Sequence, residues 1–280
     1  MKHIAAEDIL RLLPVRNNYT HKGNYGKVLL LCGSKGYTGA AYFSAMGALR
    51  SGSGVVYLGV PESIYEIEAV KLSEPVVFSL ADKNGKISSD AISIISEYLS
   101  KMDAVLIGPG LGFSEDVFRV TEYVLSHFAG PVIIDADGIN VISGHTDILR
   151  DRTAPTILTP HDGEFRRLGG ILYDDRQKSA SDLATKLNAI VLLKGYRTVI
   201  TDGIECYVNL TGNPGMAKGG SGDVLAGIIV SLLGQGLSPI DAAACGAYLH
   251  GAAGDICAEE IGQYGMLPQD MVNVLPRLLP

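Results

Sequence analysis

The sequence predicts an α/β fold in which a mainly parallel sheet is covered by helices on both faces. Short, continuous apolar runs such as Val28–Cys32 and Ala104–Gly108 are typical of strands buried on both faces of a parallel sheet. They alternate along the chain with stretches of helical spacing, for example Ile92, Ile95 and Leu99. Glycine-rich or polar turns follow many of the runs, at the sheet edge where open α/β folds bind ligands.

Strands and helices are expected to alternate along the whole chain. Strands are expected at Val28–Cys32, Val55–Val60, Val76–Phe78, Ala104–Gly108, Val132–Asp137, Thr156–Thr159, Ala189–Leu193, Thr198–Thr201 and Cys206–Val208, the last two joined as a hairpin by Asp202-Gly203. Helices are expected at Ala6–Leu13, Ala40–Arg50, Ser63–Lys71, Ser88–Lys101, Ser114–His127, Arg176–Lys186, Val224–Leu233, Pro239–Ile261 and Pro268–Leu278. Because no repeat or linker divides this alternation, residues 1–280 are expected to form a single domain.

Composition excludes several functions. Apolar residues make up 47% of the 280 residues and charged residues 19%, which favours a large buried core over disorder. The formal net charge of −7 argues against a nucleic-acid partner, which normally requires a basic face. The four scattered cysteines, the charged N-terminus and the shortness of the apolar stretches predict a soluble cytoplasmic protein without a membrane span.

The most informative stretch is the glycine-rich segment Asn213–Asp223, which leads into the apolar run Val224–Leu233. A glycine turn that opens a helix presents unpaired backbone N–H groups at the positive end of the helix dipole, which suits a phosphate. Asp223 stands at this point and has two interpretations. It is either a helix cap or a general base that takes the proton of a hydroxyl attacking a phosphoryl group.

Polar residues that follow other strands are further candidates. Asp135 and Asp137 end a predicted strand, where paired carboxylates organise Mg²⁺ or water around phosphates, although solvated loop charges are the alternative. Lys194 follows another strand and suits a nucleotide phosphate, unless it is an ordinary surface lysine. Gly110 would let a ligand approach the backbone, or it forms a tight turn. Neither the Rossmann glycine fingerprint nor the Walker pattern is present.

Three motifs give the sequence a family resemblance over essentially its full length. The segment Asn213-Pro-Gly-Met-Ala-Lys-Gly-Gly-Ser-Gly-Asp223, N-x-G-x-x-x-G-G-S-G-D, carries the signature of ribokinase-like kinases. Together with H-K-G-x-Y-G at His21–Gly26 and T-P-H-x-G-E-F at Thr159–Phe165, it resembles the ADP/ATP-dependent NAD(P)H-hydrate dehydratases in their stand-alone bacterial form. The resemblance implies a ribokinase-like fold, with no room for the N-terminal epimerase domain of some members.

The resemblance also implies an activity: NADH or NADPH hydrated at the C5–C6 double bond is phosphorylated on its C6 hydroxyl and then loses phosphate. ADP is expected as co-substrate in preference to ATP, giving AMP and phosphate, with Mg²⁺ as cofactor and a homotetramer as the assembly. Asp223 is the expected catalytic base. The residues expected to hold the hydrated dinucleotide are Ala40, Gly110, His161 and Asp223, and those expected to hold the nucleotide are Lys194, Gly195, Tyr196, Arg197, Thr198, Gly219, Gly220, Ser221 and Gly222.

Two other functions compete with this one. A ribokinase-like kinase for hydroxyethylthiazole or a sugar would explain Asp223 and the glycines equally well, but it would not account for the other two motifs. A non-catalytic nucleotide sensor could retain the phosphate loop without needing a base, and the presence of Asp223 argues against it.

Overall fold

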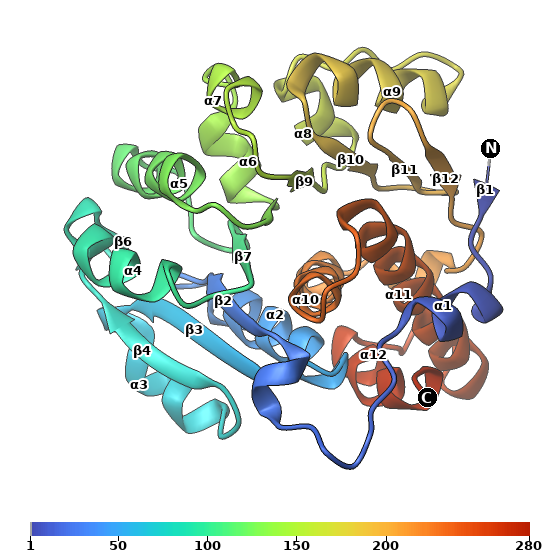
Figure 1. The fold of residues 1–280 in the computed structure, drawn as a ribbon, viewed down its shortest axis with the longest axis horizontal. Coiled ribbons are helices and arrows are strands. Elements are labelled where there is room, and N and C mark those ends of the chain that lie inside the picture. The colour runs from blue at the N-terminus through green and yellow to red at the C-terminus, as the bar shows by residue number, and fades with distance from the viewer. Residues whose placement is uncertain (1) are drawn as a thin grey trace.

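The computed structural model describes residues 2–280 and contains one large sheet with helices on both faces (Figure 1). The strands are β1 (Lys2–His3), β2 (Lys27–Leu31), β3 (Val55–Pro61), β4 (Val76–Leu80), β5 (Asp82–Lys83), β6 (Lys86–Ile87), β7 (Ala104–Ile107), β8 (Val132–Ile134), β9 (Thr156–Leu158), β10 (Ile190–Leu193), β11 (Val199–Thr201) and β12 (Cys206–Val208). The α-helices are α1 (Ala6–Leu12), α2 (Thr38–Arg50), α3 (Glu62–Lys71), α4 (Ile92–Leu99), α5 (Glu115–His127), α6 (Asp137–Ile142), α7 (Asp147–Arg150), α8 (Asp162–Arg167), α9 (Arg176–Leu187), α10 (Ser221–Gly234), α11 (Pro239–Glu260) and α12 (Pro268–Val274).

The main sheet has ten strands in the order β1-β12-β11-β10-β9-β8-β7-β2-β3-β4. All its pairings are parallel except those of β11 with β10 and β12, where the predicted hairpin reverses the chain. The predicted fold class, a mainly parallel sheet between two helical layers, is therefore confirmed.

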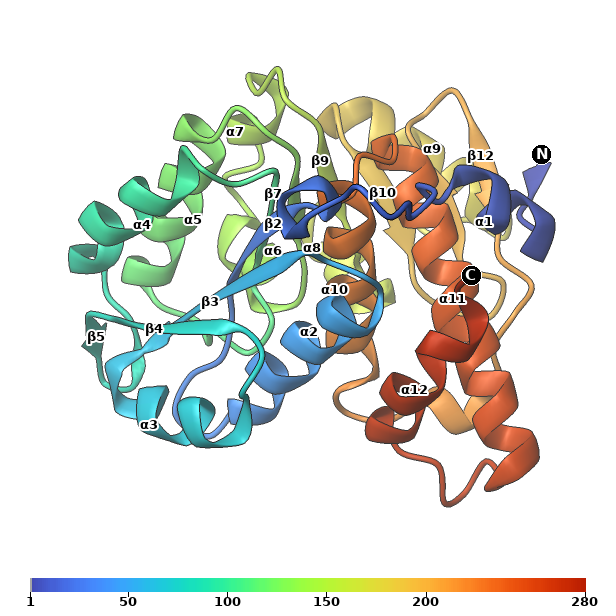
Figure 2. The ribbon, with the colours of Figure 1, turned by 60° about the horizontal axis from the view of Figure 1, so that its bottom comes forward.

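Each central strand contributes side chains to two separate cores. In β2, Val28 and Leu30 pack into the core that contains α2, α10, α11 and α12, while Leu29 and Leu31 pack into the core that contains α4 to α9. Successive side chains of a strand point to opposite faces, so a strand covered on both sides must be apolar throughout. Figure 2 shows the two helical layers on either side of the sheet.

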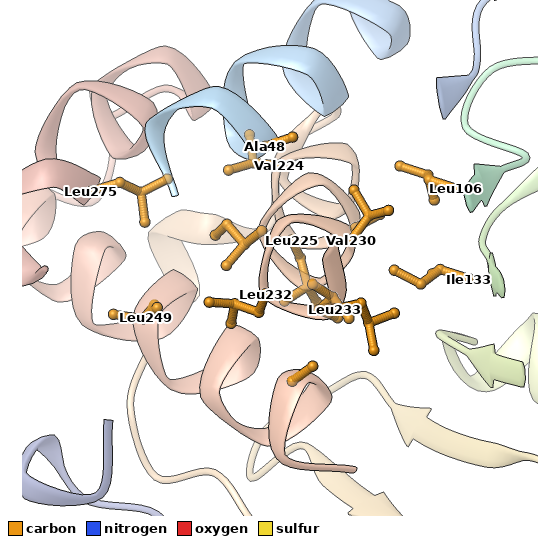
Figure 3. Packing of buried hydrophobic residues seen from close by; sticks show 14 of the residues in the cluster. Ala48, Leu106, Ile133, Val224, Leu225, Val230, Leu232, Leu233, Leu249 and Leu275 are labelled. Atoms are coloured by element: carbon orange, nitrogen blue, oxygen red, sulfur yellow. The ribbon is translucent and has the colours of Figure 1, made fainter. Parts of the chain in front are cut away.

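Helix α10 lies in the middle of one layer, and its residues from Val224 to Leu233 are all buried. In Figure 3, Leu225 and other α10 side chains lie among Ala48 of α2, Leu249 of α11 and the strand residues Leu106 and Ile133. Burying one such apolar side chain stabilises the fold by about 1.5–3 kcal/mol. The helix into which the glycine-rich segment Asn213–Asp223 (the glycine loop) leads is thus anchored on several sides.

Some predicted boundaries were wrong. Helix α10 begins at Ser221 rather than Val224, and β8 ends at Ile134, so the chain has left the sheet before Asp135 and Asp137. Ala136 adopts a φ of +50°, which reverses the chain into α6. The predicted helix Ser88–Lys101 is a 3₁₀ turn followed by α4. The sequence reading also missed β1, the β5–β6 hairpin and α6 to α8, which are all short.

Candidate active site

The ends of three neighbouring parallel strands bring together a small polar network. Asp135 follows β8, Thr159 follows β9 and Lys194 follows β10, and these strands pair in that order. Thr159 Oγ1 donates a hydrogen bond to Asp135 Oδ1 at 2.7 Å, and Lys194 Nζ donates to the same oxygen at 2.8 Å. Strand order thus places a cation and a carboxylate, 59 residues apart in sequence, in direct contact.

The glycine loop lies over this network. A Cβ atom on Gly222 would stand 3.6 Å from Lys194 Nζ and 3.9 Å from Asp135 Oδ2, so a larger side chain would intrude on the ion pair. Gly220 is the N-cap of α10, and its φ of +98° favours glycine. The N–H groups of a helix's first turn lack partners within the helix, so this end of α10 presents donors above Lys194.

Asp223 belongs to the first turn of α10 and does not cap the helix, because the N-cap is Gly220. The pKa of Asp223 is raised from 3.8 to about 7, first by burial and then by the negative charge of Asp135. Asp137 adds to this effect, while Lys194 opposes it. A carboxylate with a pKa near neutrality has the basicity that a general base needs at physiological pH.

Lys194 remains charged in this environment. Burial alone would lower its pKa, but Asp135 and Glu164 outweigh burial and raise it. Glu164 Oε2 lies 3.9 Å from Lys194 Nζ, and its carboxylate is buried. Lys194 therefore provides a fixed positive charge beside Asp223 and beneath the glycine loop, a suitable place for a phosphoryl group.

His161 and Glu164 form a capping box at the start of α8. His161 Nδ1 accepts from the Gly163 N–H at 2.9 Å, and Glu164 Oε2 accepts from the His161 N–H at 2.9 Å. Over half of the His161 side chain remains exposed, while its Nε2 lies 3.3 Å from Glu164 Oε1, so both ring nitrogens have neighbours within α8. The sequence reading missed Glu164 as a site residue. The signal was available, because an acid three residues after a cap is the second half of a capping box.

Gly110 and Ala40 meet at the next part of the sheet edge. Gly110 has a φ of +64°, and a Cβ there would lie 2.6 Å from Ala40 Cβ. Ser34 Oγ donates to the Gly110 carbonyl at 2.7 Å and ties the two loops together. A Cβ on Gly220 would lie 2.8 Å from the ring of Phe43, one helical turn beyond Ala40 on α2. Phe43 thus borders the glycine loop, one turn of α2 away from Ala40, which contacts Gly110.

The segment Gly195–Thr198 forms a tight turn after β10. Thr198 Oγ1 donates to the Gly195 carbonyl at 2.9 Å, which holds the two ends of the turn together. Tyr196 is 85% exposed, and Arg197 lies beside its ring with a φ of +56°. Apart from Lys194, the predicted nucleotide segment therefore offers mainly backbone and solvent-facing side chains.

The two carboxylates predicted to bind metal differ in their surroundings. Both oxygens of Asp137 accept a hydrogen bond: Oδ2 accepts from the Gly112 N–H at 2.8 Å and Oδ1 accepts from Asn140 at 3.2 Å. Asp135 uses Oδ1 for Thr159 and Lys194, and its Oδ2 lies toward Gly222. Across residues 2–280 no three His, Cys, Asp or Glu side chains form a metal cluster. Asp135 fits a Mg²⁺ ion completed by phosphate oxygens and water, and Asp137 keeps a free lone pair on each oxygen for such an ion or for a water bound to it.

The H-K-G-x-Y-G motif does not join the site. His21 caps a 3₁₀ turn at Lys22–Tyr25, and a Cβ on Gly26 would collide with the backbone of Gly234 at the C-terminal end of α10. Helix α10 has 14 residues and is about 20 Å long, so this motif packs at the end opposite the glycine loop.

Sheet order, helical layers and a glycine loop that opens a central helix define a ribokinase-like protein. The structure of Arabidopsis thaliana ribokinase complexed with ribose and ATP shares this fold, with a TM-score of 0.55 over 89% of this chain and 98% of that one, at 14% identity. Within the described residues, no helix is long and apolar enough to cross a membrane.

Closer similarities establish the family. A family model described as NAD(P)H-hydrate dehydratase matches residues 28–277. The ADP-dependent (S)-NAD(P)H-hydrate dehydratase of Bacillus subtilis is 36% identical over 97% of this chain and 95% of its own length. A crystal structure of the ADP/ATP-dependent NAD(P)H-hydrate dehydratase of that organism, co-crystallized with ATP/Mg²⁺, has a TM-score of 0.84 and 33% identity, covering 98% of this chain and 96% of that chain. The chain belongs to the NAD(P)H-hydrate dehydratase family.

Some relatives are much longer. The bifunctional NAD(P)H-hydrate repair enzyme of Moorella thermoacetica is 44% identical over 95% of this chain, which covers 52% of that enzyme. The chain spans about half the length of this and several other curated relatives that it matches.

Proposed function

We propose that this protein restores hydrated NADH and NADPH by transferring a phosphoryl group from ADP to the C6 hydroxyl and then eliminating phosphate. The observation that carries the proposal is the position of Asp223: a carboxylate with a pKa of about 7, in the first turn of α10, beside Lys194 and Asp135. If this helix N-terminus served only to bind phosphate, the negative charge of Asp223 would weaken that binding. The carboxylate therefore needs a function of its own.

In the first step Asp223 accepts the proton of the C6 hydroxyl, whose oxygen then attacks the terminal phosphorus of ADP and releases AMP. The backbone N–H groups of Gly219–Gly222 and the charge of Lys194 stabilise the negative charge on the transferring group. In the second step the lone pair of the ring nitrogen expels phosphate from C6, and loss of the C5 proton restores the double bond. The net reaction converts the hydrated cofactor and ADP into reduced cofactor, AMP and phosphate.

The remaining site residues are assigned to binding. Ala40, Gly110 and His161 hold the dinucleotide, and Gly195–Thr198 hold the nucleotide. Mg²⁺, when bound, neutralises phosphate charge, and Asp135 is the residue that would hold it. Asp137 orients Gly112 and Asn140 and would contact the ion through water.

Three properties of the whole molecule are also part of the proposal. Residues 1–280 act as a single domain, and the assembly is a homotetramer, which sedimentation velocity tests directly. The working compartment is the cytoplasm, which suits the four cysteines because all of them are free thiols.

The test crosses hydrated NADH and hydrated NADPH with ADP and ATP in the presence of Mg²⁺. We expect recovery of the near-ultraviolet absorbance of reduced nicotinamide, with one phosphate released per cofactor restored and no signal without nucleotide. If neither hydrated cofactor recovers while a thiazole alcohol or a sugar consumes ATP, the protein is a kinase. Nucleotide binding without any turnover would identify a sensor.

A further inference from the structure

Arg176 joins two segments of the site that are separate in sequence. It is the first residue of α9, and its Nη1 donates to Asp162 Oδ1 at 2.9 Å. Its Nη2 donates to the main-chain carbonyl of Lys194, also at 2.9 Å. Asp162 is the first residue of α8 and directly follows His161. One guanidinium therefore connects the T-P-H-x-G-E-F segment (Thr159–Phe165) to the start of the nucleotide segment (Lys194–Thr198).

The geometry of this link is specific to arginine. A planar guanidinium donates in two fixed directions at once, whereas a lysine ammonium is a single point charge on a flexible stem. Gly195 accommodates the link: its φ is +151°, and a Cβ there would lie 2.9 Å from Arg176 Nη2. The absence of a side chain at Gly195 lets the guanidinium reach the Lys194 carbonyl.

The link is better shielded than an ordinary surface pair. The Arg176 side chain is 28% exposed and that of Asp162 46%, so the shielding comes from the arginine and from its bond to the Lys194 carbonyl, which does not depend on a partner's charge. Lys178, two residues along the same helix, pairs with Asp182, but both of these side chains are more than half exposed. Such exposed pairs contribute at most about 1 kcal/mol to stability. Helix α9 therefore supplies its own matched control.

We propose that Arg176 is a positioning residue that fixes the distance between the nucleotide segment and the dinucleotide segment. This inference rests on the proposed function, in which a phosphoryl group passes between ligands held by those two segments. Misplacing reacting atoms by about 1 Å can cost on the order of 10²-fold in rate. Loss of the link should therefore reduce kcat as well as raise KM for the nucleotide, even though Arg176 itself touches neither reacting atom.

The experiment compares Arg176→Gln, Arg176→Lys and the control Lys178→Gln, which removes one positive charge from the same helix. We expect Arg176→Gln to lower kcat/KM for ADP by on the order of 10–100-fold, within the cost of misplacement, and Lys178→Gln to stay within about twofold because its pair is exposed. Arg176→Lys should keep the fold and recover only part of the loss. Equal values for Arg176→Gln and Lys178→Gln would overturn the proposal. If Arg176→Gln does not fold, a folded Arg176→Lys with wild-type kcat would also overturn it.

A double-mutant cycle separates positioning from general stability. The losses from Arg176→Gln and Asp162→Ala should add only in part, because both substitutions break the Arg176–Asp162 bond while only the first breaks the bond to the Lys194 carbonyl; those from Lys178→Gln and Asp162→Ala should add. Fully additive losses in the first pair would contradict the link. Calorimetry with ADP and Mg²⁺ alone gives a readout that does not require turnover. If the wild type binds ADP but restores no hydrated cofactor, the proposed function fails, and an unchanged ADP affinity in Arg176→Gln would separately reject the positioning role.

Discussion

Asp223→Asn should make the protein inactive and, at neutral to alkaline pH, more stable. The pKa of Asp223 is raised from 3.8 to about 7, mainly by burial. An acid whose pKa is higher in the folded state than in the unfolded state binds more protons when folded. The contribution of Asp223 to the free energy of unfolding therefore falls as pH rises from about 4 to about 7 and stays at the lower value above that.

The size of the effect follows from the interval between the two pKa values. At about 1.4 kcal/mol per pH unit, the interval from 3.8 to about 7 corresponds to a ceiling of about 4 kcal/mol. Asparagine is nearly isosteric and carries no charge, so it removes this cost. At pH 8 the variant should unfold at a temperature several degrees higher, on the order of 5–10 °C. The two proteins should have similar stability near pH 4.

The assay is thermal or urea unfolding of both proteins at pH 4, 6 and 8, with the exposed Asp174→Asn as a control for loss of one negative charge. In parallel, turnover of the variant should fall by on the order of 10²–10⁴, while nucleotide affinity is kept. The wild-type kcat/KM should rise with pH up to about 7, as Asp223 ionises. A variant with more than about a tenth of wild-type kcat would exclude the base role. A variant no more stable than wild type at pH 8 would refute the electrostatic argument.

Three further perturbations test the surroundings of this carboxylate. Gly222→Ala should bind ADP normally, because its Cβ makes only ordinary contacts with Lys194 and Asp135. Gly222→Val should remain folded and bind ADP at least about tenfold more weakly by calorimetry. Equal ADP affinities of the two variants would remove the loop from the site. Lys194→Met breaks a largely buried ion pair and should lower the free energy of unfolding, measured by urea titration, by up to about 3 kcal/mol. The exposed control Lys178→Met should lower it by less than about 1 kcal/mol. Equal losses in the two variants would contradict burial of the Lys194–Asp135 pair. Burial lowers the pKa of His250, on α11, from 6.5 to about 4, so the unfolded state takes up a proton first as the pH falls. The contribution of His250 to the free energy of unfolding should therefore fall by about 3 kcal/mol as pH falls from 6.5 to about 4, opposite in sign to the contribution of Asp223. His250→Gln should flatten that part of the stability profile, and an unchanged slope would show that His250 is not its source.

The sheet was predictable from the sequence because its strands are covered on both sides. Val28–Leu31 had to be continuously apolar once each face met a helical layer, and this pattern is visible without a structure. Helix α10 was recognisable for the same reason. The two-residue strands β1, β5 and β6 carry no such signal, since nothing about Lys2–His3 requires pairing with β12.

The residues of the candidate site were identifiable as types, but their partners were not. Asp135 and Lys194 could be assigned to strand ends, yet their contact depends on the spatial order of β8, β9 and β10, which the sequence does not state. The interpretation of Lys194 as a phosphate ligand left out its second role as the counter-charge of Asp135. Asp137 looked equivalent to Asp135 in sequence, and only its bonds to Gly112 and Asn140 separate the two.

The position of Asp223 on α10 explains how the fold tolerates a destabilised carboxylate. Burial of Asp223 costs up to about 4 kcal/mol at neutral pH. The same helix buries Ile228, Ile229 and Leu232, and three such side chains together stabilise the fold by about 4.5–9 kcal/mol. The unfavourable charge lies in the first turn, and the apolar anchoring lies in the turns that follow. Substitution of Asp223 itself should therefore alter activity at little cost to folding. By contrast, Ile228→Ala should cost about 2–5 kcal/mol and leave the chemistry of Asp223 unchanged in the molecules that remain folded.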